Sequence, residues 1–113
     1  MKTRLPEHPA SFARQHPALW ASFERLADQC HRAGPLDART RRLVKLGIAV
    51  GAGLEGGVHA QARNALAEGL RPADLHHVGL LALTTIGFPA SMAALSWIGD
   101  VTRARRRGRK ARR

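Results

Sequence analysis

Cysteine is almost absent from this chain of 113 residues, and tyrosine is missing altogether. The single cysteine, Cys30, excludes a disulfide within one chain and a zinc site built on several thiolates. Cys30 follows Leu26 and Ala27 on a predicted helix. A free cysteine in such a place usually behaves as a small buried hydrophobe, so we expect it to be buried rather than reactive. Without tyrosine, the chain has no phenolic hydroxyl to act as a donor.

Acidic residues are also scarce, because 8 Asp and Glu stand against 19 Lys and Arg, which gives a formal net charge of +11. The last eleven residues, Arg103 to Arg113, hold eight of the basic residues and no acid, and subtracting these eight leaves +3 on the other 102 residues. Runs of like charge repel one another, so we expect residues 103–113 to form a disordered basic tail.

Two functions fit such a tail. It is either a solvated segment that aids solubility or an electrostatic arm for nucleic acid or another polyanion. The tail contains no aromatic residue that could stack on bases, which argues against single-stranded nucleic acid.

Long hydrophobic runs are rare. The N-terminus lacks the apolar stretch of a signal peptide, so a cytoplasmic location is the expectation. No residue from Val78 to Gly99 is charged, and that length could span a bilayer. However, Gly87 and Pro89 divide the segment. Two shorter helices that meet at a turn explain it better, so we expect no membrane partner.

Apolar residues recur at helical spacing along most of the chain, and no alternation typical of strands is present, so the sequence predicts an all-α fold. Pro17, Pro72 and Pro89 are placed where helices would start, and Gly69 where one would end. The sequence divides into an N-terminal extension (1–16), a helical domain (17–102) and the basic tail (103–113).

Glycines gather in the middle of the domain, with five between Gly47 and Gly57. Each costs about 1 kcal/mol in a helix interior relative to alanine. A helix that runs through all five is therefore disfavoured, and we expect a break near Gly53.

Glu55 and His59 are four residues apart where the next helix is predicted to begin, so both side chains share one face. Glu55 could simply be a first-turn carboxylate stabilised by the exposed N–H groups, and His59 a hydrogen-bonded, half-buried side chain. Alternatively, a neutral His59 oriented by Glu55 could remove a proton next to a carbonyl or assist loss of carbon dioxide. His77 could join them across the helix pair or a subunit boundary, so the predicted catalytic residues are Glu55, His59 and His77.

The same three residues would also form a two-histidine, one-carboxylate set of the kind that binds zinc or iron. No spacing in the sequence supports the third ligand, so we expect neither a metal nor another cofactor. Gln61 and Arg63 are further candidates to contact a substrate carboxylate, although Arg63 on a solvated face is the simpler interpretation.

The region from Leu36 to Ile98 resembles the carboxymuconolactone decarboxylase-like family, which includes the alkylhydroperoxidase D type proteins. The resemblance is carried by an ordered series of segments: Leu36–Val50, Ala62–Gly69, Pro72–Val78 and Gly87–Ala90. It implies an alkylhydroperoxidase D-like helical bundle that forms a homo-oligomer, either a trimer or a hexamer. It also implies peroxiredoxin-type or lactone-decarboxylase activity on a small-molecule ligand.

The departures from the family pattern argue against thiol peroxidase activity. In a gap-free alignment anchored on Gly69, the Cys-x-x-Cys pair and following His of the peroxidase branch fall on Leu54, Gly57 and Gln61, and the upstream Glu of that branch falls on Arg42. The decarboxylase-type His also falls on Gln61, and His77 falls where a Glu is usual. The run from Leu54 to His59 resembles a branch of uncharacterised members.

Three hypotheses follow. The first is acid–base chemistry on a small carbonyl or lactone compound, carried by Glu55 and His59. The second is a scaffold or binding protein that keeps the fold without the cysteines and uses Arg103 to Arg113 to bind a polyanion such as nucleic acid. The third, minor one is a thiol peroxidase that uses Cys30 alone.

Overall fold

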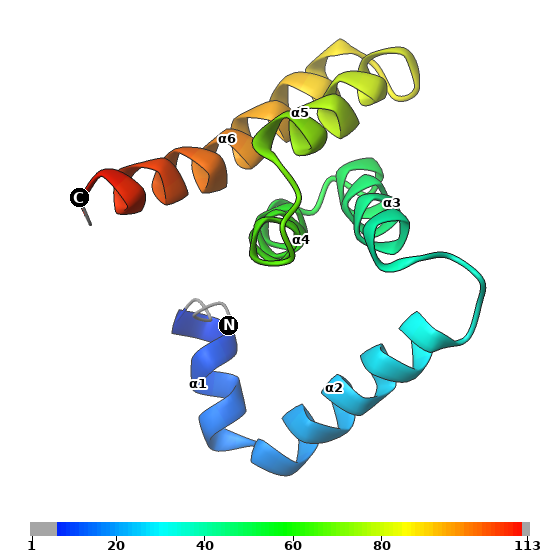
Figure 1. The fold of residues 1–113 in the computed structure, drawn as a ribbon, viewed down its shortest axis with the longest axis vertical. Helices are drawn as coiled ribbons and strands as arrows, with labels where there is room; N and C mark the ends of the chain where they lie inside the picture. The colour runs from blue at the N-terminus through cyan, green and yellow to red at the C-terminus, as the bar shows by residue number, and fades with distance from the viewer. Residues whose placement is uncertain (1–6, 112–113) are drawn as a thin grey trace. The chain divides into compact units, whose positions relative to one another are not determined.

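The computed structural model describes residues 7–111, without the side chains of residues 7 and 8. Within this range every regular element is a helix, which confirms the all-α prediction (Figure 1). In chain order the elements are α1 (Glu7–Gln15), α2 (Pro17–Arg32), α3 (Ala38–Gly51), α4 (Glu55–Ala67), α5 (Pro72–Leu81), the short 3-10 helix η1 (Ala82–Thr84) and α6 (Phe88–Ala111).

The chain divides into two compact units, Met1–Ala38 and Arg39–Arg113. The first unit contains α1 and α2, and the second contains nearly all of α3 together with α4, α5, η1 and α6. The boundary between the units falls inside the stretch 17–102 that was predicted to form one domain. Glu55, His59 and His77 all lie in the second unit, whereas Cys30 lies in the first.

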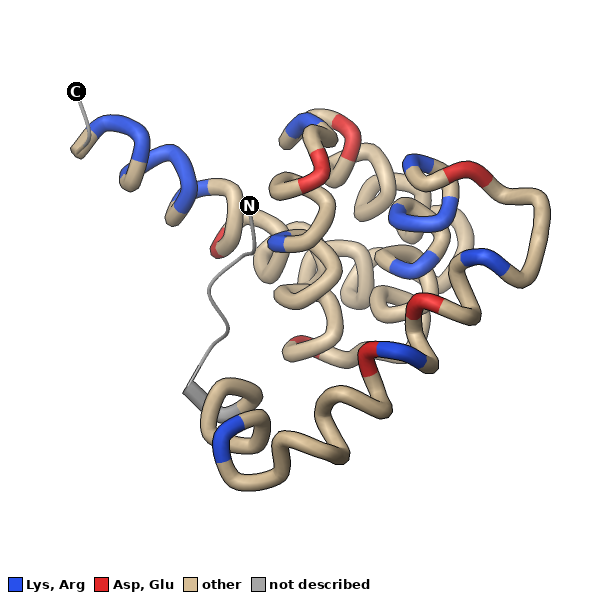
Figure 2. Tube along the Cα trace, turned by 60° about the horizontal axis from the view of Figure 1, so that its bottom comes forward, with Lys and Arg blue, Asp and Glu red and all other residues tan. Residues whose placement is uncertain are grey.

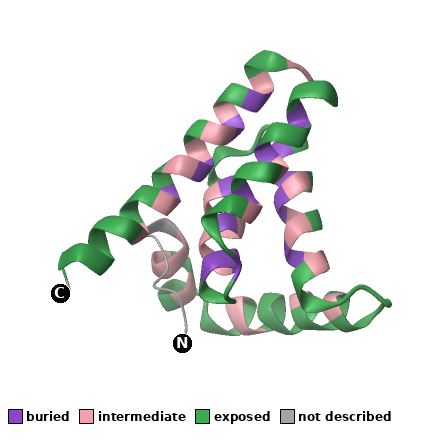
Figure 3. Cartoon of the chain, turned by 45° about the horizontal axis from the view of Figure 1, so that its top comes forward, coloured by how far each residue is buried: buried purple, intermediate pink, exposed green. Residues whose placement is uncertain are grey.

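In the first unit, α2 starts at Pro17 as predicted, since the missing N–H of proline costs nothing in the first turn. Aromatic rings join α2 to α1: Trp20 meets Phe12 edge to face, with 6.4 Å between ring centroids, and stacks on Phe23. None of the side chains of α2 is buried (Figure 3). The expectation that Cys30 is buried is therefore wrong, because the free thiol is exposed.

The predicted break between α3 and α4 is confirmed. Gly53 adopts a φ of 67°, a left-handed conformation that glycine tolerates without steric cost. The backbone N–H of Leu54 then donates to the carbonyl of Ala49 at 3.1 Å, which satisfies one of the last carbonyl groups of α3. Gly69, with a φ of 94°, ends α4 in the same way.

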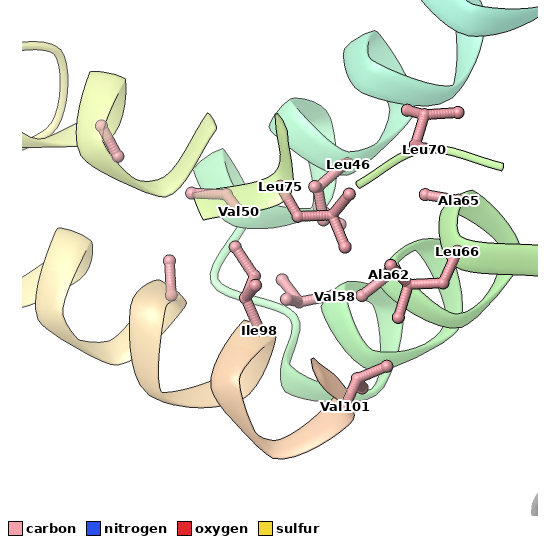
Figure 4. Packing of buried hydrophobic residues seen from close by; sticks show 13 residues of the cluster. Leu46, Val50, Val58, Ala62, Ala65, Leu66, Leu70, Leu75, Ile98 and Val101 are labelled. Atoms are coloured by element: carbon pink, nitrogen blue, oxygen red, sulfur yellow. The ribbon is translucent and has the colours of Figure 1, made fainter. Parts of the chain in front are cut away.

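The core of the second unit is small and aliphatic. It is built from one face of α3, most of α4, and the facing sides of α5 and α6, with 13 buried residues (Figure 4). These are Leu46, Ala49, Val50, Val58, Ala62, Ala65, Leu66, Leu70, Leu75, Ala82, Ala94, Ile98 and Val101. Where α5 and α6 pack closely, the buried hydroxyl of Ser91 donates to the carbonyl of Gly79 at 2.7 Å.

The uncharged segment from Val78 to Gly99 is divided in the way the sequence predicts. The helix α5 ends at Leu81, η1 follows, and Gly87 turns the chain with a φ of 104° before α6 begins. Among the described residues, no helix combines the length and the apolar character needed to cross a membrane.

The basic C-terminal segment differs from the disordered tail expected. Residues 103–111 continue α6 as regular helix, and residues 112–113 lie outside the described range. Arginine, lysine and alanine are all good helix formers, and cations near a helix C-terminus interact favourably with its dipole. Figure 2 shows the basic residues following one another along these last turns.

Candidate functional site

Glu55 occupies the first turn of α4 and is exposed. The residue before it, Leu54, makes no side-chain cap, so a carboxylate in this turn faces the unpaired N–H groups and the positive end of the helix dipole. Although both residues are described, no hydrogen bond joins Glu55 to His59. The position of Glu55 fits a carboxylate that stabilises a helix start.

His59 is instead paired with a residue of α6. Its Nε2 lies 3.0 Å from Oδ2 of Asp100, and the two side chains are 24% and 47% exposed. The second carboxylate oxygen of Asp100 accepts a hydrogen bond from Arg103 at 3.0 Å. The imidazole is therefore held by a carboxylate, as an acid–base histidine requires, but the carboxylate comes from Asp100 rather than Glu55.

Asp100 is not among the site residues predicted from the sequence. It lies 41 residues from His59, and only the packing of α4 against α6 brings the two together. Within α4 itself, Arg63 follows His59 by one helical turn and is partly buried, and burial lowers the pKa of its guanidinium below its ordinary value. It forms no ion pair with a described residue. His59 and Arg63 thus place an imidazole and a cation on one face of α4.

His77 lies elsewhere, on the rim of a groove between α3, α5 and η1. The groove has a volume of about 460 Å³, and its walls are mainly apolar, with Val44 and Val50 from α3 and Leu81 from α5. His77 is exposed there beside the ion pair of Arg39 with Asp74, which measures 3.0 Å. Neither Glu55 nor His59 lines this groove.

The proposed metal set does not form. Within residues 9–111, whose side chains the structure describes, no three His, Cys, Asp or Glu residues are grouped so that they could hold a metal ion. Two of the three predicted site residues, Glu55 and His59, share α4, and the third is placed on the separate groove.

Asp74 anchors the start of α5. One carboxylate oxygen accepts the backbone N–H of Arg71 at 2.9 Å, and the other accepts from the guanidinium of Arg71 at 3.1 Å and of Arg39 at 3.0 Å. The bonds from the Arg71 side chain and backbone, followed by that from Arg39, hold the pKa of the Asp74 carboxyl far below its usual range. Asp74 is therefore an ionised structural carboxylate.

A polar cluster joins α3 to the middle of α4 and to Glu68, the residue that follows this helix. The buried guanidinium of Arg42 donates to both carboxylate oxygens of Glu68, at 3.2 and 2.7 Å, and to Oε1 of Gln61 at 2.7 Å. A planar guanidinium and a carboxylate form two parallel bonds in such a pair, which fixes their relative orientation. Arg42 has a side-chain exposure of only 9%, so its charge is almost entirely matched inside the protein.

Comparison with protein families agrees with the resemblance found in the sequence, since the profile of the carboxymuconolactone decarboxylase family matches residues 17–100. The chain belongs to the carboxymuconolactone decarboxylase family. No match is found among curated proteins.

In this member of the carboxymuconolactone decarboxylase family, Arg42 and Gln61 contact each other directly. The gap-free alignment predicted that these two positions correspond to the Glu and His of the peroxidase branch. A guanidinium is a hydrogen-bond donor only and has no lone pair with which to accept a proton.

Proposed function

We propose that this member of the carboxymuconolactone decarboxylase family is a self-associating binding protein, whose oligomer is built on the exposed apolar stripe of α3. One observation carries this proposal: α3 has two apolar stripes, and its own unit buries only one of them. An uncovered apolar stripe on a small protein is typical of a protein interface.

The buried stripe of α3 follows helical spacing through Leu46, Ala49 and Val50, all in the core. The second stripe lies about half a turn away, on the opposite side of the helix, and includes Val44 and Ile48. These two side chains are 45% and 66% exposed. Burying two aliphatic side chains of this size contributes roughly 1.5–3 kcal/mol each when water is excluded completely.

Glycines in this stripe favour another helix as the occupant. Gly47 and Gly51 lie one turn apart on α3, and both line the groove. A Cβ atom at Gly51 would meet nothing within 4 Å, and one at Gly47 would meet only Val78 at 3.9 Å. The backbone of α3 is therefore open to close approach from outside its own unit.

A second copy of this chain is the occupant that we infer. The groove rim carries both signs of charge, with Arg39 and Asp74 side by side. A surface with both signs can pair with itself across a two-fold axis, where each Arg39 of one copy would face an Asp74 of the other. The homo-oligomer implied by the family resemblance agrees with this proposal.

The Arg42 cluster supports a role other than thiol peroxidase chemistry. The thiolate is the nucleophile in such chemistry and needs a partner that receives or delivers its proton. The only cysteine of the chain, Cys30, lies on α2. The polar cluster between α3 and α4 consists of Arg42 and the two residues to which it donates hydrogen bonds, Glu68 and Gln61.

The test is the molar mass of the full chain in solution, measured by light scattering after size exclusion. We expect a multiple of 12.3 kDa, and we expect Ile48→Glu to shift it towards the monomer, because the new carboxylate would be buried without a partner in the interface. Ala73→Glu adds the same charge at an exposed position in the first turn of α5, where acids are tolerated, and should leave the mass unchanged. A monomeric wild-type protein, or equal dissociation by both variants, would refute the proposal.

A second candidate function is proton transfer by His59, favoured by its 3.0 Å contact with Asp100. The carboxylate would orient the ring, while Arg63 on the same face would attract a substrate carboxylate. The name of the family makes carboxymuconolactone a suitable probe.

This candidate predicts that the full chain decarboxylates carboxymuconolactone. His59→Ala and Asp100→Asn should both reduce kcat by at least about 100-fold, since general acid–base groups contribute roughly 10²–10⁴ to a rate. His76→Ala is the matched control, because this exposed histidine of α5 has no contact with Asp100. Turnover that survives His59→Ala would exclude the mechanism.

A further inference from the structure

The last turns of α6 form a cationic helix beyond the packed part of the second unit. The helix α6 has 24 residues and is about 36 Å long, whereas α5 has 10 residues and the 3-10 helix η1 adds 3. The buried positions of α6 end at Val101. In Figures 1 and 2 the turns that follow extend past α5, and basic residues occupy most of their positions.

Arg105 ties this extension to the rest of its unit. Its Nη1 donates to the carbonyl oxygen of Leu66 at 2.9 Å, in the last turn of α4, where carbonyl groups have no partner within their own helix. The contact fixes the direction in which α6 leaves the core for at least one turn past Val101. Arg105 is accordingly half-buried, and its charge compensates the negative end of the α4 dipole.

Four other cations near the end of α6 lie on one face of this helix. Arg106, Arg107 and Lys110 follow Arg103 by three, four and seven residues, which places these four residues on one face of α6. We call these four residues the cationic stripe. Only Arg103 is paired, with Asp100 at 3.0 Å, while Arg106, Arg107 and Lys110 are exposed and form no ion pair with a described residue.

We propose that the cationic stripe of α6 binds double-stranded DNA through its phosphates, without reading base sequence. Duplex DNA carries one negative charge per about 1.7 Å of its axis. The stripe places four cations along about 10 Å of helix, which spans roughly six phosphates. An α-helix also fits the major groove of B-form DNA in width.

The composition of the extension separates duplex DNA from two other polyanions. Thr102 to Ala111 contain no aromatic residue, so the stacking platform of a single-strand binding protein is missing. The same residues contain no large apolar side chain opposite the stripe, which an interfacial membrane helix needs for insertion. This inference goes beyond the self-association proposed above and does not depend on it.

Fluorescence anisotropy of a labelled mixed-sequence duplex, titrated with the full chain at several salt concentrations, tests the proposal. We expect the logarithm of the binding constant to fall with the logarithm of the salt concentration with a slope of about −3 to −4, since each neutralised phosphate contributes about −0.9. Arg106→Gln/Arg107→Gln should reduce the steepness of this slope by about 2 and weaken binding at low salt by at least about tenfold.

The matched control is Arg14→Gln/Arg25→Gln, which removes the same charge from exposed positions of α1 and α2. It should retain nearly the wild-type affinity. Parallel titrations use the single strand of the same sequence and vesicles of phosphatidylcholine with phosphatidylserine, and both should bind more weakly than the duplex.

Equal loss of affinity in both double variants would show that only net charge matters and would overturn the proposal. Stronger binding to the single strand or to the vesicles would overturn it in favour of that partner, and so would no duplex binding at low salt. The molar mass of Arg106→Gln/Arg107→Gln should match that of the wild type, so a failure here is distinguishable from a failure of the proposed self-association.

Discussion

Arg42 is the residue on which the junction of α3 with α4 most depends. It is a buried cation that is neutralised by Glu68, just past the end of α4, and that donates a further hydrogen bond to Gln61 within α4. A buried charge is tolerated when its hydrogen bonds are satisfied, and removing either side leaves the other with a desolvation cost. At the residue scale, Arg42 and its two partners therefore serve structural stability.

Replacing Arg42 should reveal this role. We expect Arg42→Ala to lower the free energy of unfolding by about 2 kcal/mol, less than a fully buried pair would lose because the Glu68 side chain is 43% exposed. Arg39→Ala breaks the pair of Arg39 with Asp74, in which the arginine is 54% exposed, and should cost less than about 1 kcal/mol. Urea unfolding followed by circular dichroism measures both. Similar losses for the two variants would contradict a buried structural role for Arg42.

Asp74 makes the stability of the protein depend on pH. Its pKa is lowered in the folded state by the bonds from Arg71 and Arg39. The unfolded chain therefore takes up the proton first, and the stabilising contribution is complete above the ordinary pKa of about 3.9 and is lost as the pH falls below it.

The variant Asp74→Asn should accordingly be less stable than the wild type at pH 7. The difference in Tm between the two proteins should shrink as the pH is lowered from 7 to 3, since protonation of this carboxyl in the unfolded wild-type chain stabilises the unfolded state. Asp28→Asn, which removes the exposed partner of Arg32, is the control and should show little difference at either pH. A Tm difference for Asp74→Asn that widens towards low pH would contradict the argument.

At the scale of elements, the pair α5 and α6 depends on one glycine. A Cβ atom at Gly79 would lie 2.6 Å from Cδ2 of Leu95, closer than real contacts allow, and 3.2 Å from its Cγ, which is a tight contact. The carbonyl of Gly79 also accepts the hydroxyl of Ser91. Close packing of these two helices thus requires the absence of a side chain at this position.

We expect Gly79→Ala to lower the free energy of unfolding by about 1 kcal/mol, because overpacking costs 1–3 kcal/mol and the gain in helix propensity offsets about 1. Gly108→Ala is the matched substitution, since a Cβ atom there would meet nothing within 4 Å. It should leave stability unchanged or raise it by up to about 1 kcal/mol. Thermal unfolding of both variants measures these changes in stability. If Gly79→Ala were more stable than the wild type, α6 would be able to move away from α5 without a loss of stability, which would contradict the prediction.

At the scale of the whole molecule, stability is distributed unevenly. All 13 core residues lie in the second unit, and α2 has no buried residue. Hydrogen exchange followed by mass spectrometry should therefore find the amides of α4, α5 and the first half of α6 protected most strongly, while those of α2 exchange at least about tenfold faster, because few buried contacts oppose local opening. Equal protection of α2 would mean that another surface covers its apolar face in solution.

How much the sequence could predict differs between fold and site. The starts at Pro17 and Pro72, the break at Gly53 and the end at Gly69 follow from local backbone chemistry, and each is confirmed. The assignment of Glu55 as partner of His59 rested on spacing within one helix. Asp100 lies on another helix, and no local pattern indicates it.

Three properties could be predicted from the sequence: the chain is helical, most of its helices begin and end at recognisable residues, and it has no pair of cysteines for thiol redox chemistry. These properties depend on residue identity and on neighbours within a few positions. The tertiary structure was needed to show that Arg42 contacts Gln61 and Glu68, that His59 pairs with Asp100, and that Cys30 is exposed. Such contacts depend on which helix faces approach each other. The burial and hydrogen bonds summed over the whole core set that geometry, and no single segment contains it.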